Sequence, residues 1–338
     1  MDARDKRGHD ESALDGAGDA SNKRPAVRGF AGIGGNSLMN RRQFLIAGMP
    51  LAAALAAPAT GGAAAQAEPA ARDFEQGHAH SDGVRLFFIR AGDGPLILFL
   101  HGAPDSSALY EAQVREFGGN HLAVAPNLRG FPPSDAPEAV DAYRMPRLLG
   151  DVHGLLDHFG RRRCILVGND WGGYLAWVFA SAYPTRVERL IVLNAPHPAI
   201  HLREVRDSPA QNRASQYERN FHSAAAPYPP WYNYYRADPI KVPASVAESA
   251  AMPVPDLAAH FFAGAAEPPA TTSLRVAVPT LVIWGMRDQA LLPGQLDGLE
   301  AYVADLTVRR IADAGHYPMR SHPDLVNAAI GDFLRRAK

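Results

Sequence analysis

The stretch VGNDWGG, Val167 to Gly173, runs out of an apolar segment and into a helical pattern. A strand that enters a helix through a Gly-x-Asp-x-Gly turn holds its central side chain, here Asp170, at the top of a sheet. The same turn places the first backbone N–H groups of the helix beside that side chain. We therefore expect Asp170 to occupy the exposed position of a nucleophile at the end of a buried strand.

Apolar runs of strand length alternate with helical patterns on both sides of this turn. Continuous apolar runs are typical of strands that are buried on both faces, and their alternation with helices indicates a mostly parallel sheet covered by helices on both faces. The apolar runs cover residues 84–89, 96–100, 122–125, 164–167, 190–193, 280–284 and 306–311. The clearest helical patterns cover residues 147–159, 173–182 and 323–334.

One interval, residues 199–277, breaks this alternation. It is rich in Pro, Ala and Tyr and contains no buried-strand run. Ligands of open parallel sheets bind at the carboxyl ends of the strands. An insertion that leaves after one strand and returns before the next therefore predicts a helical cap over that edge. The predicted core consists of residues 68–198 and 278–338.

Residues 1–67 form an N-terminal extension with its own pattern. NRRQFL at 40–45 leads into an apolar run that Pro50 interrupts, and the small residues AQA end at Ala67. This order resembles a twin-arginine export signal and predicts cleavage near Ala67 and a periplasmic location. The apolar run is too short for a stable membrane span. An N-terminus without any targeting role is the alternative, and the chain starts at Met1 or at Met39.

Composition limits the possible functions of the remaining chain. The sequence has 338 residues, of which 47% are hydrophobic and 20% are charged, as expected for one sizeable globular domain. The extension holds 8 of the 34 basic and 6 of the 35 acidic residues, which leaves 26 basic and 29 acidic residues. This balance argues against a nucleic-acid partner. Cys164, the only cysteine, excludes an intrachain disulfide and a thiolate metal cluster.

Three further candidate residues follow predicted strands. Asp288 lies in WGMRDQAL, His316 lies in AGHYPM, and the stretch HGAPDSS offers the backbone N–H of Ala103. The order nucleophile, acid and histidine along the chain is that of the α/β-hydrolase fold. The N–H groups of Ala103 and Trp171 would together form an oxyanion hole.

These motifs carry a resemblance to a known family. HGAPDSS, NLRGFPPSD, VGNDWGG, LNAPHP, WGMRDQAL and GHYPM resemble the α/β-hydrolase superfamily, and within it the epoxide hydrolases and haloalkane dehalogenases, whose nucleophile is Asp. The resemblance covers nearly all of the chain after the extension. It implies an alkyl ester on Asp170, hydrolysed by water that His316 activates, while Asp288 orients and stabilises the histidine.

The resemblance to epoxide hydrolases further implies two cap tyrosines that donate a proton to the epoxide oxygen. Tyr217 in SQYERNF matches the first, and Tyr235 in NYYRADP resembles the second. The two are only 18 residues apart, whereas the family usually places several helices between them. One of Tyr228, Tyr232 and Tyr234 could therefore take the second role, or the aromatic cluster could simply pack the cap.

The sequence favours opening of epoxides to vicinal diols, with a small apolar substrate and water as partners. A haloalkane or haloacid dehalogenase with the same Asp170 is the first alternative, in which Trp171 and Trp231 would hold the halide. Arg129 in NLRG could grip a carboxylate, although we favour a structural role for it. A non-catalytic binding module on the same fold is the second alternative. No cofactor and no metal site are expected, and Pro104 is a candidate for a cis peptide bond.

Overall fold

The computed structural model describes residues 74–267 and 269–336. The predicted export signal, its cleavage site at Ala67 and the alternative start at Met39 lie outside the described residues. Over the described ranges, no helix combines the length and the apolar character that crossing a bilayer requires.

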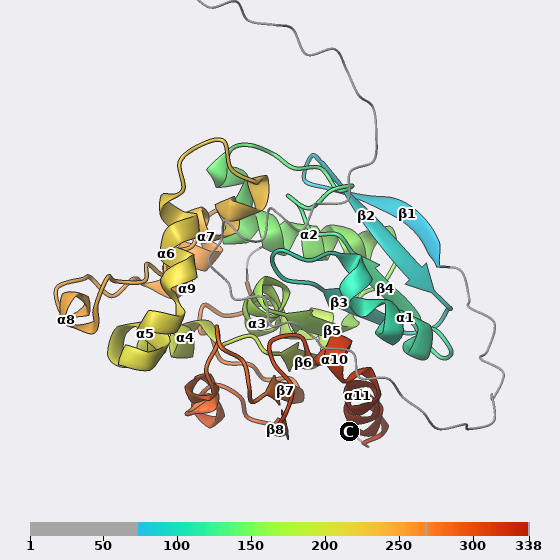
Figure 1. Ribbon diagram of the computed structural model, residues 1–338. Coiled ribbons are helices and arrows are strands. Elements are labelled where there is room, and N and C mark those ends of the chain that lie inside the picture. The colour runs from blue at the N-terminus through green and yellow to red at the C-terminus, as the bar shows by residue number, and fades with distance from the viewer. Residues whose placement is uncertain (1–73, 268, 337–338) are drawn as a thin grey trace, which may run out of the picture. The chain divides into compact units, whose positions relative to one another are not determined.

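The described chain is built on a twisted sheet of eight strands in the order β1-β2-β4-β3-β5-β6-β7-β8 (Figure 1). Strands β3 to β8 are parallel to one another, and β2 is antiparallel to its neighbours β1 and β4. The strands are β1 Glu75–Ser81, β2 Val84–Ala91, β3 Leu96–Leu100, β4 Leu122–Pro126, β5 Cys164–Asn169, β6 Val187–Leu193, β7 Thr280–Gly285 and β8 Leu306–Ile311. The α/β-hydrolase fold predicted from the sequence is confirmed.

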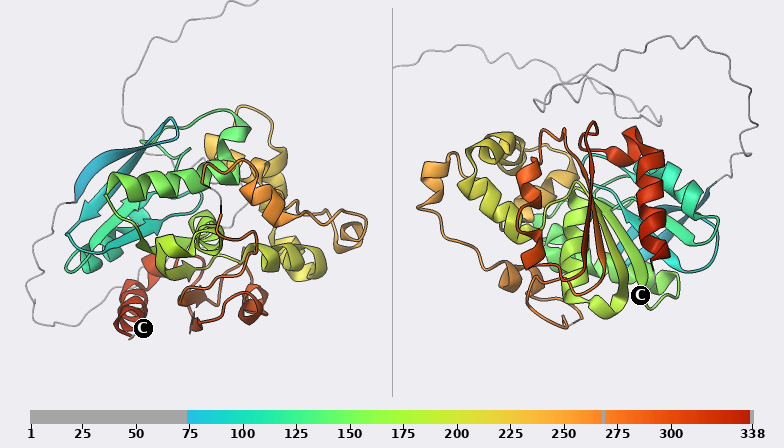
Figure 2. Two further views of the ribbon diagram at one scale, coloured as in Figure 1. Left: turned by 180° about the vertical axis from the view of Figure 1, so that it is seen from behind. Right: turned by 90° about the horizontal axis from the view of Figure 1, so that it is seen from below.

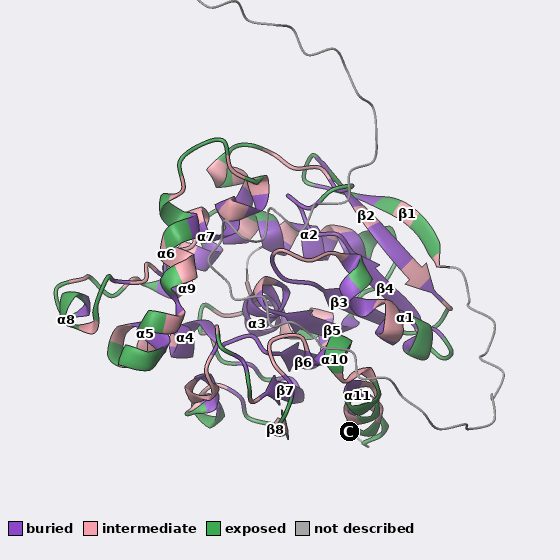
Figure 3. Cartoon of the chain, viewed as in Figure 1, coloured by how far each residue is buried: buried purple, intermediate pink, exposed green. Residues whose placement is uncertain are grey.

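Helices cover both faces of the sheet (Figure 2). Helices α1 (Glu111–Phe117) and α11 (Pro323–Arg335) pack on one face, and α2 (Met145–His158) and α3 (Trp171–Ala182) pack on the other. Alternate residues of the central strands point to the first of these faces, as the period of a strand requires. On β3, β5, β6 and β7 they are Ile97, Phe99, Ile165, Val167, Ile191, Leu193, Leu281 and Ile283. Figure 3 shows the buried strands at the centre and the exposed residues on the outer faces of the helices.

Each predicted apolar run lies within an observed strand, and the three predicted helices match α2, α3 and α11 to within two residues at each end. The strand β1 was not among the predicted runs. Its sequence EQGHAHS buries only Ala79 and Ser81, because β1 is at the edge of the sheet and one of its faces is open to solvent. An edge strand of this kind lacks the continuous apolar run by which the central strands were recognised.

The interval 199–277 contains short helices that cluster away from β1 and α1 (Figure 1). They are α4 Pro198–Asp207, α5 Pro209–Ala214, α6 Gln216–Ser223, α7 Asn233–Ala237, α8 Val246–Ser249 and α9 Leu257–Phe262. The two ends of the interval meet at a buried histidine: His197 Nε2–H donates to the carbonyl of Leu274 over 2.9 Å. The His197 ring also stacks on Tyr302, with 4.3 Å between the ring centroids.

Candidate active site

The turn between β5 and α3 holds Asp170 in a strained conformation, with φ 52° and ψ −126°. Glycines make room for this turn. A Cβ atom on Gly102 would lie 2.3 Å from the Cβ of Asp170, and a Cβ on Gly172 would lie 2.2 Å from the carbonyl oxygen of Leu100. A positive φ at a non-glycine residue costs free energy and is found mainly where function requires it. The strain and the close packing together fix the carboxylate of Asp170 at the carboxyl end of β5.

The three residues predicted as a triad come together at this edge of the sheet. His316 Nδ1 lies 2.7 Å from Asp288 Oδ2, and His316 Nε2 lies 3.4 Å from Asp170 Oδ2. Asp288 follows β7, and His316 lies in the loop between β8 and α10 (Pro318–Ser321). The side chain of Asp288 is completely buried, and that of His316 is 17% exposed. The two ring nitrogens of His316 thus face two different carboxyl groups, Asp288 and Asp170.

Asp288 has hydrogen bonds to both of its oxygens. Its Oδ1 accepts the backbone N–H groups of Ala290 at 2.9 Å and Leu291 at 3.0 Å. Its Oδ2 accepts His316 Nδ1–H and also the side-chain amide of Asn194 at 2.8 Å. Asn194 accepts the Gly285 N–H through its own Oδ1 at 2.8 Å. A carboxylate held by four donors cannot rotate, so it fixes both the tautomer and the orientation of His316.

Asn194 is a site residue to which the sequence analysis assigned no role. It stands in the motif LNAPHP directly after β6, has φ 38°, and is fully buried. The available signal was its place directly after the predicted strand 190–193, at the sheet edge where Asp170, Asp288 and His316 were also expected.

The charges around His316 decide its protonation. Burial alone would lower its pKa, but the charge of Asp288 and the contacts with Asp170 and Asp288 outweigh burial and raise the pKa of His316 to about 10. Burial likewise works against ionisation of Asp288, yet His316 and the two backbone amides hold the pKa of Asp288 below its usual value. Before any reaction, the ring is thus an imidazolium between two carboxylates.

The loop after β3 supplies one of the two predicted oxyanion donors. The N–H of Ala103 donates to Asp170 Oδ1 over 2.8 Å, and the Ala103–Pro104 peptide bond is cis, as the sequence suggested. His101 holds this loop: its Nδ1–H donates to the Gly102 carbonyl at 2.8 Å, and its Nε2 accepts the N–H of Leu128 at 3.0 Å. Burial lowers the pKa of His101 to about 4, so the ring stays neutral in this role.

The backbone N–H of Trp171 is the first amide of α3 and follows Asp170 directly. In the part of the chain that the structure describes, this amide forms no hydrogen bond with the Asp170 carboxylate, so of the two predicted oxyanion donors only Ala103 contacts the carboxylate at rest.

The two predicted cap tyrosines lie in one cavity with Asp170. The cavity has a volume of about 250 Å³, and Tyr217 on α6 and Tyr235 on α7 both line it. Their ring centroids are 6.1 Å apart, with the ring planes nearly perpendicular. Within residues 74–267 and 269–336, neither hydroxyl donates a hydrogen bond to a protein acceptor. The short separation in sequence therefore does not keep the two rings apart, because α6 and α7 pack against each other.

The other three tyrosines lie elsewhere. Tyr234 donates its hydroxyl to the Arg129 carbonyl at 3.0 Å, in a buried position behind the cavity wall. Tyr228 and Tyr232 stack on each other, with 5.9 Å between their ring centroids. None of the three lines the cavity with Asp170.

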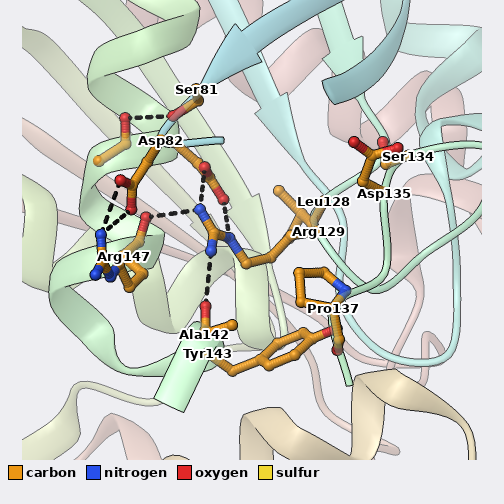
Figure 4. Close-up of polar contacts among 12 residues, drawn as sticks. Ser81, Asp82, Leu128, Arg129, Ser134, Asp135, Pro137, Ala142, Tyr143 and Arg147 are labelled. Carbon is orange, nitrogen blue, oxygen red and sulfur yellow. Dashed lines mark hydrogen bonds and ion pairs between the residues drawn. The ribbon is translucent and has the colours of Figure 1, made fainter. Parts of the chain in front are cut away.

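Arg129 is held in a network of polar contacts (Figure 4), and it does not line the cavity. Its guanidinium donates to both oxygens of Asp151, at 2.5 and 2.6 Å, and to the carbonyls of Ala142 and Arg147. The side chain is 2% exposed, so it cannot grip a substrate carboxylate. The structural interpretation of Arg129 is confirmed.

Trp231, the second halide donor in the dehalogenase alternative, stacks on Phe131 and packs against Phe221. It does not line the cavity that contains Asp170. The cavity thus holds two tyrosines together with Asp170, whereas of the two tryptophans proposed for a halide only Trp171 lines it.

Comparisons with known proteins agree with this geometry. Residues 95–227 match the family model described as alpha/beta hydrolase fold. The chain is 34% identical to epoxide hydrolase 3 of Xenopus tropicalis over 277 residues, covering 75% of each chain. It is 31% identical to human epoxide hydrolase 4 over 284 residues, covering 75% of this chain and 76% of the human protein.

Solved structures give the same result. One solved structure is described as novel epoxide hydrolases belonging to the alpha/beta hydrolases superfamily in metagenomes from hot environments. It is 34% identical to this chain with a TM-score of 0.66, and the match covers 79% of this chain and all of the other. A mutant epoxide hydrolase from Bacillus megaterium, in complex with its product, is 28% identical with a TM-score of 0.66, covering 77% of this chain and all of the other. With the Asp170 turn, the Asp288–His316 pair and these relatives, the chain belongs to the epoxide hydrolase group of the α/β-hydrolase superfamily.

Proposed function

We propose that this protein opens epoxides to vicinal diols through a covalent ester on Asp170. The observation that carries the proposal is the cavity that Tyr217 and Tyr235 line together with Asp170, with hydroxyls that donate to no acceptor among the described residues. Phenols in this position suit an oxygen leaving group, which needs a proton, better than a halide. The names of the similar proteins support the same activity.

In the first step, one Asp170 oxygen attacks an epoxide carbon and the bond from that carbon to the ring oxygen breaks. The oxygen takes a proton from Tyr217 or Tyr235. Desolvation raises the pKa of both phenols well above the usual value, and nearby carboxylates, Asp170 among them, raise it further. Such phenols keep their protons until a strongly basic alkoxide develops beside them.

In the second step, water that His316 activates attacks the carbonyl carbon of the Asp170 ester. The negative charge then develops on the Asp170 oxygen that the Ala103 N–H already contacts, and the amide of Trp171 is the proposed second donor. The bond from the Asp170 carbonyl carbon to the alkyl oxygen then breaks, and that oxygen takes from His316 the proton that came from water. The remaining proton of the Asp170 carboxyl group returns to His316, so that one epoxide and one water yield one diol and free enzyme.

The ion pairs at rest explain how His316 becomes a base only when it is needed. Esterification turns Asp170 into a neutral group and removes one of the two negative charges that raise the pKa of His316. The pKa falls, so the ring can give its proton to the tyrosinate that the first step left, and can then accept another proton from water. Asp288 remains to stabilise the imidazolium that forms during the attack.

The decisive experiment is intact-mass analysis of the His316→Ala variant after incubation with a panel of epoxides and haloalkanes. Without the base, the ester should accumulate on Asp170 with the full mass of the epoxide. The double variant Asp170→Asn/His316→Ala is the control and should stay unmodified. An adduct with the mass of a haloalkane less its hydrogen halide would overturn the proposal in favour of a dehalogenase. The absence of any adduct would favour a binding module.

We also propose that residues 1–67 direct export by the twin-arginine route. The paired Arg41 and Arg42, the apolar run after them and the small residues up to Ala67 support this reading. N-terminal sequencing of the protein from a periplasmic fraction should begin near Glu68. Replacing both arginines by lysine should retain an uncleaved protein in the cytoplasm, whereas unchanged export and processing would refute the proposal.

A further inference from the structure

The cavity carries polar groups that the proposed reaction does not use. Four side chains form what we call the polar cluster: Tyr174 from α3, His201 from α4, Glu218 from α6, and Asp238 directly after α7. All four line the same cavity as Asp170. The remaining wall is mixed: Ile240, Val242 and Leu291 are apolar, whereas Arg219, His222, Ser223 and Lys241 are polar or basic. A cavity that only had to admit an apolar epoxide would not need carboxylates in its wall.

Glu218 is paired at one oxygen only. His201 Nε2 lies 3.2 Å from Glu218 Oε2, and the side chains of the two residues are 8% and 11% exposed. On its other side, His201 Nδ1 is 3.2 Å from the amide nitrogen of Gln295. Glu218 Oε1 is buried and has no hydrogen-bond partner among residues 74–267 and 269–336. A buried carboxylate oxygen without a donor is an acceptor that remains available to a ligand.

Tyr174 is the second unpartnered group. The residue is 5% exposed. Its hydroxyl is buried and forms no hydrogen bond with any described residue. Burial raises the pKa of the Tyr174 phenol well above its usual value, and the nearby carboxylate of Asp238 raises it further. The hydroxyl is therefore a neutral group that can accept or donate a hydrogen bond.

Asp238 completes the cluster. Its Oδ1 accepts the N–H of Ile240 at 2.6 Å. Burial raises the pKa of Asp238 to about 7, because the protein solvates its ionised form poorly. A hydrogen-bond donor on a ligand would stabilise that ionised form.

We propose that the polar cluster is a substrate subsite that binds a hydrogen-bond donor, a hydroxyl or an ammonium group, carried by the epoxide at a distance from its oxirane ring. The inference rests on the proposed function, because it places the oxirane at Asp170. Glu218 Oε1 accepts the donor, the Tyr174 hydroxyl lies in the same wall, and Asp238 provides negative charge. A site built to hydrogen-bond a substrate group discriminates strongly against analogues that lack it, because its buried acceptors then remain unpaired.

The test compares matched substrates with the full-length enzyme. Terminal epoxyalkanes with a hydroxyl at the far end are each paired with the plain epoxyalkane of the same chain length, and a second series carries an ammonium group there. At the chain length that reaches the cluster, we expect kcat/KM of the donor-bearing epoxide to exceed that of its plain partner by about tenfold or more. The series that shows the preference identifies the donor.

Two variants probe the cluster itself. Tyr174→Phe removes a hydroxyl that forms no protein hydrogen bond, and Glu218→Gln removes the charge but keeps the shape of the side chain. Each should reduce the preference ratio severalfold. Tyr228→Phe is the matched control, because Tyr228 packs on Tyr232 and Arg236 outside the cavity, and it should keep the wild-type ratio. Because Glu218 pairs with His201, thermal unfolding of each variant is recorded alongside.

The outcomes separate the two proposals. If no epoxide is turned over, the proposed function fails. If plain epoxides are turned over but the ratio stays near one in both series at every chain length, the subsite is overturned while the epoxide hydrolase assignment stands. A clear preference that Tyr174→Phe and Glu218→Gln both leave unchanged also overturns the subsite.

Discussion

Replacing Asp170 by Asn should lower the pKa of His316 without removing its contact partner. The two carboxylates raise that pKa from its ordinary 6.5 to about 10, which corresponds to about 5 kcal/mol in favour of the imidazolium. At a charge separation of about 5 Å and an effective dielectric constant of about 20, one unit charge contributes about 3 kcal/mol, or about 2 in pKa. We therefore expect the pKa of His316 to fall clearly below its wild-type value in Asp170→Asn.

The assay is an NMR titration of protein labelled at the histidine ring carbons. The chain contains 13 histidines, so the His316 signal is assigned by its loss in His316→Gln. The variant Asp288→Asn provides a second comparison and should also lower the pKa. If the pKa of His316 stays near 10 in Asp170→Asn, the nucleophile does not control the base. The proposed release of the base on esterification would then be wrong.

Three further substitutions test the framework and the cavity. Arg129→Ala leaves the buried Asp151 unpaired and should reduce the free energy of unfolding in urea by about 3–5 kcal/mol, whereas replacing both partners by apolar residues should recover most of it. Gly102→Ala places a Cβ against Asp170 and should cost at least tenfold in kcat, with circular dichroism reporting whether the fold is kept. Because Asp238 has a pKa of about 7 in the folded protein, above its usual 3.8, the folded state binds more protons between these values and its stability falls as pH rises through them. Asp238→Asn should therefore gain in Tm relative to the wild type between pH 4 and pH 7, and a constant difference in Tm would contradict this assignment.

The sequence predicts the central strands well, because burial on both faces forces continuous apolar runs such as those of β3 and β5. It predicts Asp170, Asp288 and His316 as site residues because each follows a strand, and parallel strands bring such positions to one edge. The same reasoning does not predict β1, because only Ala79 and Ser81 of this strand are buried. Edge strands are stabilised by pairing on one side and leave a weaker pattern.

The polar cluster could not be predicted for a different reason. His201, Glu218 and Asp238 lie on three separate pieces of the interval 199–277, and their meeting depends on how short helices pack. Helices of four to ten residues with no strand between them have many possible packings. The packing of short helices also decides the positions of Tyr217 and Tyr235. Their spacing in the sequence differs from that of the family, yet the structure brings their rings into one cavity.

The hydrogen bond between His197 and Leu274 has a consequence for protein engineering. It ties together the two points at which the helical interval leaves and rejoins the sheet, and the stacking of His197 on Tyr302 anchors both to the core. Residues between these points can in principle be exchanged as one module for the corresponding segment of a relative. The junctions of such a chimaera should lie between His197 and Leu274 in the sequence. Both residues then stay with the recipient, and Asp170, Asp288 and His316 are unchanged.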